Sequence, residues 1–175
     1  RLRRHALLFQ AHALQHLETI DEAIVLDHFE SFVVRQEEAL GIATPVGQRT
    51  WFVYGADPAP HRRGGRRTPA QRRRLRARPV RLPTKPFVRS TDRVLDILLA
   101  KSPRDRTLRL VTDGHPAYRR ALAARPDRDR VRHRVYVNPP RGPKGSEPSP
   151  VAKVRDRQLR PVDALHGLLR HHPHA

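Results

Sequence analysis

Apolar residues near the start of the chain change from helical to extended spacing. Residues 1–19 carry leucines and alanines at helical spacing, which predicts an amphipathic leading helix. Residues 23–34 form a β-branched and aromatic run, which predicts a buried strand with an acid, Asp27, after its first apolar residues. Two further extended runs, residues 43–46 and 49–55, are separated by proline and glycine and predict an antiparallel hairpin beside that strand.

Helical and extended spacing alternate in the second half. The pattern predicts a helix over residues 91–101 and a strand over residues 108–113. The remaining predicted elements are a helix over 117–124, a strand over 131–137, a proline-rich loop over 139–150 and a helix over 161–171. Because helix-linked parallel strands follow a right-handed crossover, we expect strand 108–113 to lie beside the first strand. The order predicts an α/β fold with a mixed sheet, an antiparallel trio first and helix-linked strands after it.

Composition adds a strong positive charge. The 175 residues include 36 Lys and Arg against 17 Asp and Glu, a formal net charge of +19. Such an excess favours a polyanionic partner, and nucleic acid is the commonest one in a cell. Coding bias in a GC-rich genome accounts for the preference for Arg over Lys, but it does not explain why the charges are clustered.

The positive charge is concentrated in residues 58–91, which hold 12 Lys and Arg and no acid. This composition predicts an irregular basic insertion with at most a short helix beginning near Thr68 and Pro69. Guanidinium groups match phosphate oxygens, so we expect salt-sensitive, sequence-independent binding of nucleic acid; the alternative is a merely solvated segment. The candidate nucleic-acid-binding residues are Arg62, Arg63, Arg66, Arg67, Arg72, Arg73, Arg74 and Arg76.

Several protein classes are excluded by what the sequence lacks. The absence of cysteine excludes disulfides and thiolate metal sites. Apolar runs are far shorter than the roughly 18 residues that span a bilayer, and there is no signal-peptide pattern, so we expect a soluble, cytoplasmic protein without a membrane partner.

The length of the chain suits one domain. The chain has no methionine and begins at Arg1, so we expect a fragment of a longer protein.

Asp27 and Asp113 are the candidate catalytic and metal-binding residues. Each follows an apolar run, where an unpaired carboxylate is costly. Oxygen ligands on neighbouring strands suit Mg²⁺ or Mn²⁺, and such ions promote in-line displacement at phosphodiesters. The alternative is that each acid only ends its strand as a turn former or helix cap.

Four blocks of sequence resemble bacterial insertion-sequence transposases of the DDE type. They are residues 26–32 (Leu-Asp-His-Phe-Glu-Ser-Phe), 46–55, 63–74 and 112–118 (Thr-Asp-Gly-His-Pro-Ala-Tyr), and the resemblance extends from about Asp21 to Arg170. It implies an RNase H-like catalytic core over residues 21–175, after a leading helix over residues 1–20 that belongs to an upstream region. It further implies that Asp27 and Asp113 are the first two catalytic, metal-binding acids.

The same resemblance implies the activity and its setting. Such enzymes use divalent metal to hydrolyse DNA at the ends of the element and to transfer the strand to target DNA. A glutamate on a late helix completes their triad; residues 161–171 resemble the stretch that leads to it, so we expect this acid beyond Ala175 and an inactive chain as it stands. Glu147, Asp156 and Asp163 are not assigned to that role. The implied location is the bacterial nucleoid, and a homo-oligomer is left open.

Other residues receive structural predictions. Glu30 lies three positions after Asp27 and is expected to face the other side of a straight strand. His115 and Tyr118 are predicted to cap and pack a helix, and Trp51 and Tyr54 to lie in the core or on the sheet face. Four histidines near the end are interpreted as a bias of composition and not as a metal site: His166, His171, His172 and His174.

Two rival functions remain. One is a non-enzymatic, basic nucleic-acid-binding protein, in which the two aspartates only end their strands. The other is a metal-dependent nuclease of the same fold. The position of the two carboxylates relative to each other distinguishes the binding protein from the enzymes.

Overall fold

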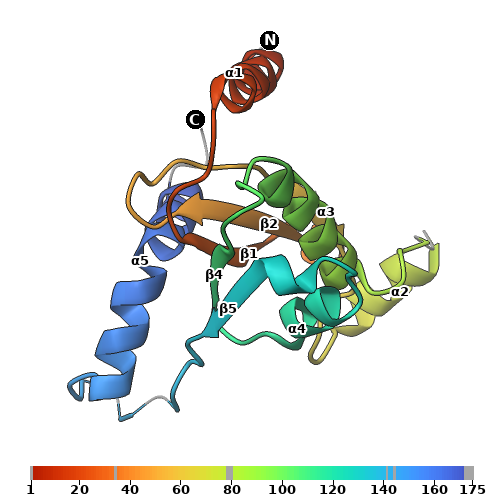
Figure 1. Cartoon of the computed structure of the whole chain (residues 1–175). Helices are drawn as coiled ribbons and strands as arrows, with labels where there is room; N and C mark the ends of the chain where they lie inside the picture. Colours follow the sequence, from red (N-terminus) through yellow and green to blue (C-terminus); the bar gives the residue numbers. More distant parts are fainter. Residues whose placement is uncertain (1, 34, 78–80, 141, 144, 172–175) are drawn as a thin grey trace.

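The computed structural model describes residues 2–33, 35–77, 81–140, 142–143 and 145–171. Its elements, shown in Figure 1, are α1 (Leu2–His16), β1 (Ile24–Phe32), β2 (Ala39–Gly47), β3 (Asp57–Pro60), α2 (Pro69–Ala77), α3 (Pro86–Ala100), β4 (Leu108–Thr112), α4 (Pro116–Ala123), a 3₁₀ turn (Arg128–Arg130), β5 (Val131–Val135) and α5 (Pro150–His171).

The five strands form one mixed sheet in the order β3-β2-β1-β4-β5. β1 pairs antiparallel with β2, and β2 antiparallel with β3. β1 pairs parallel with β4, and β4 parallel with β5. The predicted α/β fold with a mixed sheet is confirmed, as is the position of strand 108–113 beside the first strand. Three antiparallel strands do come first, but the third is not the predicted one.

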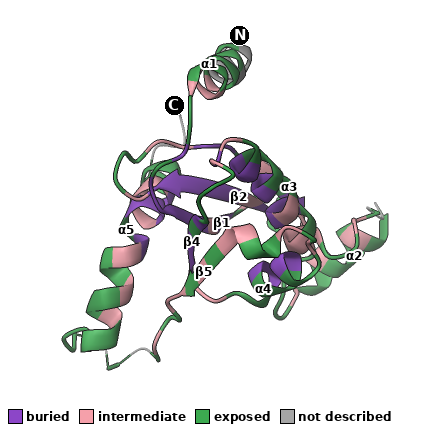
Figure 2. Ribbon diagram, viewed as in Figure 1, coloured by how far each residue is buried: buried purple, intermediate pink, exposed green. Residues whose placement is uncertain are grey.

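Helices cover both faces of the sheet. In Figure 1, α3 and α4 lie on one side and α5 on the other, while α1 stands away from the body. Side chains alternate along β1, so Leu26 joins the core under α3 and α4, whereas Val25 joins a second cluster with Leu159 and Val162 of α5. Figure 2 shows that β1 and β2 are buried, while β5 is half-buried to exposed. The sheet therefore has a covered centre and an open edge at β5.

The predicted strand over residues 49–55 is wrong. Residues 48–50 form a turn, and the backbone at Trp51 has a φ of 61°. Only Val53 makes an isolated bridge to β2, and β3 is formed later, over Asp57–Pro60. The turn forms because the carboxylate of Glu22, far earlier in the chain, accepts the backbone N–H groups of residues 49 and 50.

Two helices begin earlier than predicted. α3 begins at Pro86 rather than Thr91, because proline suits the first helical turn. α5 begins at Pro150 rather than Pro161, and Pro161 lies buried inside it. The expected short helix near Thr68 and Pro69 is confirmed as α2, but residues 58–91 are not wholly irregular, since they also include most of β3 and the start of α3. Within the described part of the chain, none of the helices is both long enough and apolar enough to cross a membrane.

Candidate functional site

The candidate site lies where β4 ends beside the middle of β1. The parallel register pairs Val25 with Val111, and Asp27 and Asp113 each lie two residues further along the chain. Gly114, with a φ of 94°, turns the chain towards α4 directly after Asp113. A Cβ at this glycine would lie 2.9 Å from a methyl carbon of Val135, so the tight turn requires glycine. The fold therefore brings two acids that are far apart in sequence to neighbouring positions.

The carboxyl group of Asp27 has an unusual environment. Burial, together with the charge of Asp113, raises the pKa of Asp27 from 3.8 to about 6. Hydrogen bonds from the backbone N–H of His28 (2.7 Å) and the hydroxyl of Tyr118 (3.2 Å) oppose this rise. The charge of Asp163 on α5 adds to it. The pair Asp27 and Asp113 thus carries electrostatic repulsion that the described residues do not neutralise.

A buried hydrogen-bonded chain orients Asp27 from the α4 side. The Tyr118 hydroxyl, which is fully buried, lies 3.0 Å from Nδ1 of His28, whose Nε2 lies 2.7 Å from Oγ of Ser90. Burial lowers the pKa of His28 to about 3, so this imidazole is neutral at pH 7. Because the tyrosine hydroxyl donates to Asp27, the single N–H of the neutral imidazole is assigned to Nδ1 and donates to the tyrosine oxygen. Nε2 then accepts from Oγ of Ser90, whose contact with the carbonyl oxygen of Phe87 is longer, at 3.4 Å. This arrangement fixes one carboxylate oxygen.

A second histidine meets Asp27 from the α5 side. His166 places Nδ1 3.7 Å from Oδ2 of Asp27, and its Nε2 lies 2.6 Å from the hydroxyl of Thr44, the residue opposite Asp27 on β2. Thr44 donates its hydroxyl hydrogen to the backbone oxygen of Asp27 at 3.0 Å, so Nε2–H of His166 is the donor to Thr44. Burial lowers the pKa of His166 to about 4, and the contact is therefore not an ion pair at pH 7. The interpretation of His166 as merely compositional is wrong.

The side chains around Asp27 offer few ligands for a divalent cation. Two carboxylates that repel each other, one of them largely buried, suit a hard cation that would relieve this repulsion. Asp163, which approaches from α5, is held by Arg155 at 2.5 Å. Among the described residues, no group of three or more His, Asp or Glu side chains is arranged to hold a metal ion. Asp27 and Asp113 would thus be the only protein ligands that this site offers among the described residues, and a cation between them would need its other ligands from water or substrate.

The predicted basic residues lie on and before α2, and the described ones are mostly exposed. This segment packs beside the tip of the β1–β2 hairpin: Arg74 pairs with Glu37 at 3.1 Å, and Arg63 donates to Gln36 at 2.5 Å. Most of the eight guanidinium groups, among them those of Arg62, Arg66, Arg72, Arg73 and Arg76, lie at exposed positions. The basic segment is therefore at the end of the sheet towards which β1 runs.

Other predictions have mixed outcomes. His115 caps α4 by accepting the N–H of Ala117, and Tyr118 is buried, as expected. Glu30 is exposed and faces His61 at 3.2 Å. Tyr54 is in the core. Trp51 is 46% exposed and lies outside the strands, directly after the turn at residues 48–50, so its placement in the core or on the sheet face was wrong. His171 is exposed, while His172 and His174 lie outside the described residues.

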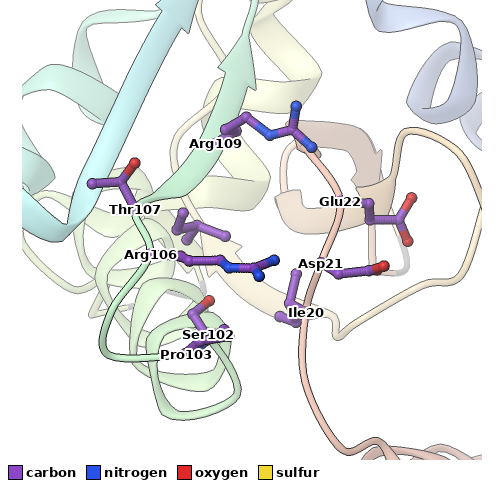
Figure 3. Close-up of a pocket in the computed structure, with 9 residues that line it drawn as sticks. Ile20, Asp21, Glu22, Ser102, Pro103, Arg106, Thr107 and Arg109 are labelled. Carbon is purple, nitrogen blue, oxygen red and sulfur yellow. The ribbon is translucent and has the colours of Figure 1, made fainter.

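A separate pocket of about 180 Å³ lies beside the N-terminal ends of β1 and β4, away from Asp27 and Asp113 (Figure 3). The acid Glu22 that lines it has a structural role. Its side chain is 5% exposed, and the carboxylate accepts hydrogen bonds from the hydroxyls of Thr50 and Tyr54 and from two backbone N–H groups. Burial alone would raise the pKa of Glu22, but these hydrogen bonds outweigh it and lower the pKa. Both carboxylate oxygens of Glu22 therefore accept hydrogen bonds that stabilise the turn after β2.

Comparison with known proteins gives no relative: no family model matches the chain, and neither a curated protein nor a solved structure matches it.

Proposed function

We propose that the chain is part of the catalytic core of a DDE-type DNA transposase with an RNase H-like fold. The observation that carries the proposal is the position of Asp27 and Asp113, two repelling carboxylates at neighbouring positions of adjacent parallel strands. The mixed sheet, with antiparallel strands first and helix-linked parallel strands after them, is compatible with the RNase H-like core that the resemblance implies. The basic segment around α2 supports DNA as the substrate.

In this proposal Asp27 and Asp113 hold Mg²⁺ or Mn²⁺. When bound, the cation supplies charge stabilisation and an activated hydroxyl for displacement at a DNA phosphodiester. The chain's own residues prepare the site. Tyr118 donates to one oxygen of Asp27 and fixes its direction, while His166 covers the other oxygen from α5. The exposed arginines of the basic segment bind backbone phosphates and hold the DNA beside the carboxylates.

The proposal is tested by the metal dependence of DNA binding. The unmodified chain should bind a labelled DNA duplex more tightly in Mn²⁺ than in EDTA, because a shared cation links the carboxylates to a phosphate. The double variant Asp27→Ala with Asp113→Ala should lose this increment but keep the metal-free binding, which the arginines supply.

A matched control replaces two exposed acids, Asp105→Ala with Asp129→Ala, and should keep the increment. If the unmodified chain gains nothing from Mn²⁺, or if the double variant gains as much, the metal site is absent. The non-enzymatic binding protein is then the better account, since its DNA binding would depend on charge alone.

A further inference from the structure

Three arginines gather on the part of the sheet that α5 leaves open. Arg109 of β4 is paired in register with Arg132 of β5, and Arg134 follows two residues later, paired with Val111. Paired residues of neighbouring strands point to the same face, so all three lie on the face of Val111, which packs towards α5. α5 packs mainly on β1, β2 and β4, and the three arginines are exposed.

These arginines line a small pocket beside α5. The pocket has a volume of about 160 Å³, and its other polar lining is the side-chain amides of Gln48 and Gln158, which hydrogen-bond to each other at 2.8 Å. No carboxylate lines it among the described residues. Sites for whole small molecules are commonly about 300–1,000 Å³, so this pocket suits a compact anion such as one phosphate group.

The described residues do not neutralise the charge of this cluster. Like charges directly opposite on neighbouring strands destabilise a sheet, and Arg109 and Arg132 are such a pair. In the part of the chain that the structure describes, none of the three arginines takes part in an ion pair.

The carboxylates near Arg109 are already occupied. Figure 3 shows Arg109 at the edge of the pocket that it shares with Asp21 and Glu22. Asp21 accepts two hydrogen bonds of 2.9 Å from the guanidinium of Arg49, and Glu22 holds the turn after β2. The fold brings Arg109 and Arg132 together, and no acid among the described residues pairs with them, which points to an external anion.

We propose that this pocket binds a backbone phosphate of the DNA strand that reacts at Asp27 and Asp113. The inference rests on the proposed function, because it assigns the path of the substrate strand. Arg134 is paired with Val111, two residues before Asp113, and Arg109 lies four residues before it, which corresponds to about 7 and 13 Å along β4. At about 3.4 Å per nucleotide, the bound phosphate lies about two to four nucleotides from the reacting one.

This path is continuous with the basic segment. Asp27 lies in β1 between Ala23, which directly precedes the strand and lines the arginine pocket, and Val33, which directly follows it and lines a pocket beside α2. The carboxylates therefore lie between two separate basic surfaces. A DNA strand that contacts both would cross the position of the two acids.

The test measures binding of a fluorescein-labelled single-stranded oligonucleotide in EDTA, by anisotropy, over a range of salt. The variant Arg109→Gln, Arg132→Gln and Arg134→Gln should bind about tenfold or more weakly at low salt, because charge-assisted hydrogen bonds to phosphate are lost. The slope of the logarithm of affinity against the logarithm of salt should become shallower by about 1. Far-UV circular dichroism shows whether the variant is folded.

A control variant of equal charge separates this pocket from general attraction. Arg104→Gln, Arg120→Gln and Arg128→Gln removes three exposed arginines that do not line the pocket, and it should weaken binding less than about threefold. Equal losses in the two triple variants would overturn the inference. If the pocket variant keeps its affinity while Mn²⁺ still tightens DNA binding through Asp27 and Asp113, this inference fails and the proposed function stands. If the unmodified chain binds no DNA, both fail.

Discussion

Replacing Asp27 with asparagine should stabilise the folded protein at neutral pH. Burial and the charge of Asp113 raise the pKa of Asp27 from 3.8 to about 6, so the unfolded chain loses this proton at a lower pH than the folded chain does. Stability therefore falls as the pH rises from about 4 to about 6, and the loss is complete above that range. A difference of about 2 pKa units corresponds to about 3 kcal/mol.

Asparagine fits the site. Its oxygen can accept the hydrogen bonds that Tyr118 and the backbone of His28 donate, and its amide group can donate to Nδ1 of His166. The variant should therefore gain up to about 3 kcal/mol above pH 6 and nearly nothing below pH 4. In urea, with slopes of about 1–3 kcal/mol per molar, the midpoint should rise by about 1–3 M at pH 8.

Urea titrations followed by circular dichroism from pH 4 to pH 8 measure this gain. Asp105→Asn, at an exposed position, serves as the matched control and should leave the midpoint unchanged at every pH. A gain that does not change with pH, or a loss of stability at pH 8, would refute the reasoning that Asp27 is held ionised at a cost to the fold.

Three further outcomes are expected. Tyr118→Phe removes a hydrogen bond to the ionised form of Asp27, so the pKa of Asp27 should rise. Carbon NMR of the labelled Asp27 carboxyl follows this pKa, and an unchanged value would contradict the orienting role of Tyr118. Glu22→Gln should lower stability at pH 7 by about 3 kcal/mol, because two hydrogen-bond donors face the new amide in either of its orientations. Since the pKa of Glu22 is lowered from 4.5, the deficit should shrink as the pH falls below 4.5 and through the lowered pKa, and thermal melts across this range check it. Gly114→Ala should lower the melting temperature, because alanine at a φ of 94° is strained and its Cβ would lie 2.9 Å from Val135; an unchanged melt would contradict this.

The sequence predicts the central strands well because their signal is local. The β-branched run before Asp27 and the run before Asp113 each form a buried strand, and the rule for crossover connections places them side by side. The strand expected over residues 49–55 failed for a non-local reason. Those residues have the composition of a strand. The carboxylate of Glu22, which lies 27 positions before Arg49 and 28 before Thr50, accepts hydrogen bonds from the backbone N–H groups of both residues and stabilises a turn there.

The surroundings of the two acids could be predicted only in part. His28 and Ser90 belong to elements that meet only in the folded chain, so no local pattern links them. His166 had a usable signal: it lies on the same helical face as Leu159 and Val162, at spacings of seven and four, which predicts a buried position. The cluster of Arg109 with the arginines of β5 could not be predicted from the sequence, because only the strand register brings its members together.

Uptake of Mn²⁺ by the purified chain, measured by the loss of the free-ion electron paramagnetic resonance signal, tests the central claim most directly. The account predicts saturable uptake at about pH 8 that weakens as the pH falls below about 6, where Asp27 gains its proton. It also predicts that Asp27→Asn and Asp113→Asn each abolish this uptake, while Glu30→Gln leaves it intact. Uptake that is absent in the unmodified chain, or equal in all four proteins, would contradict a shared cation between these two carboxylates.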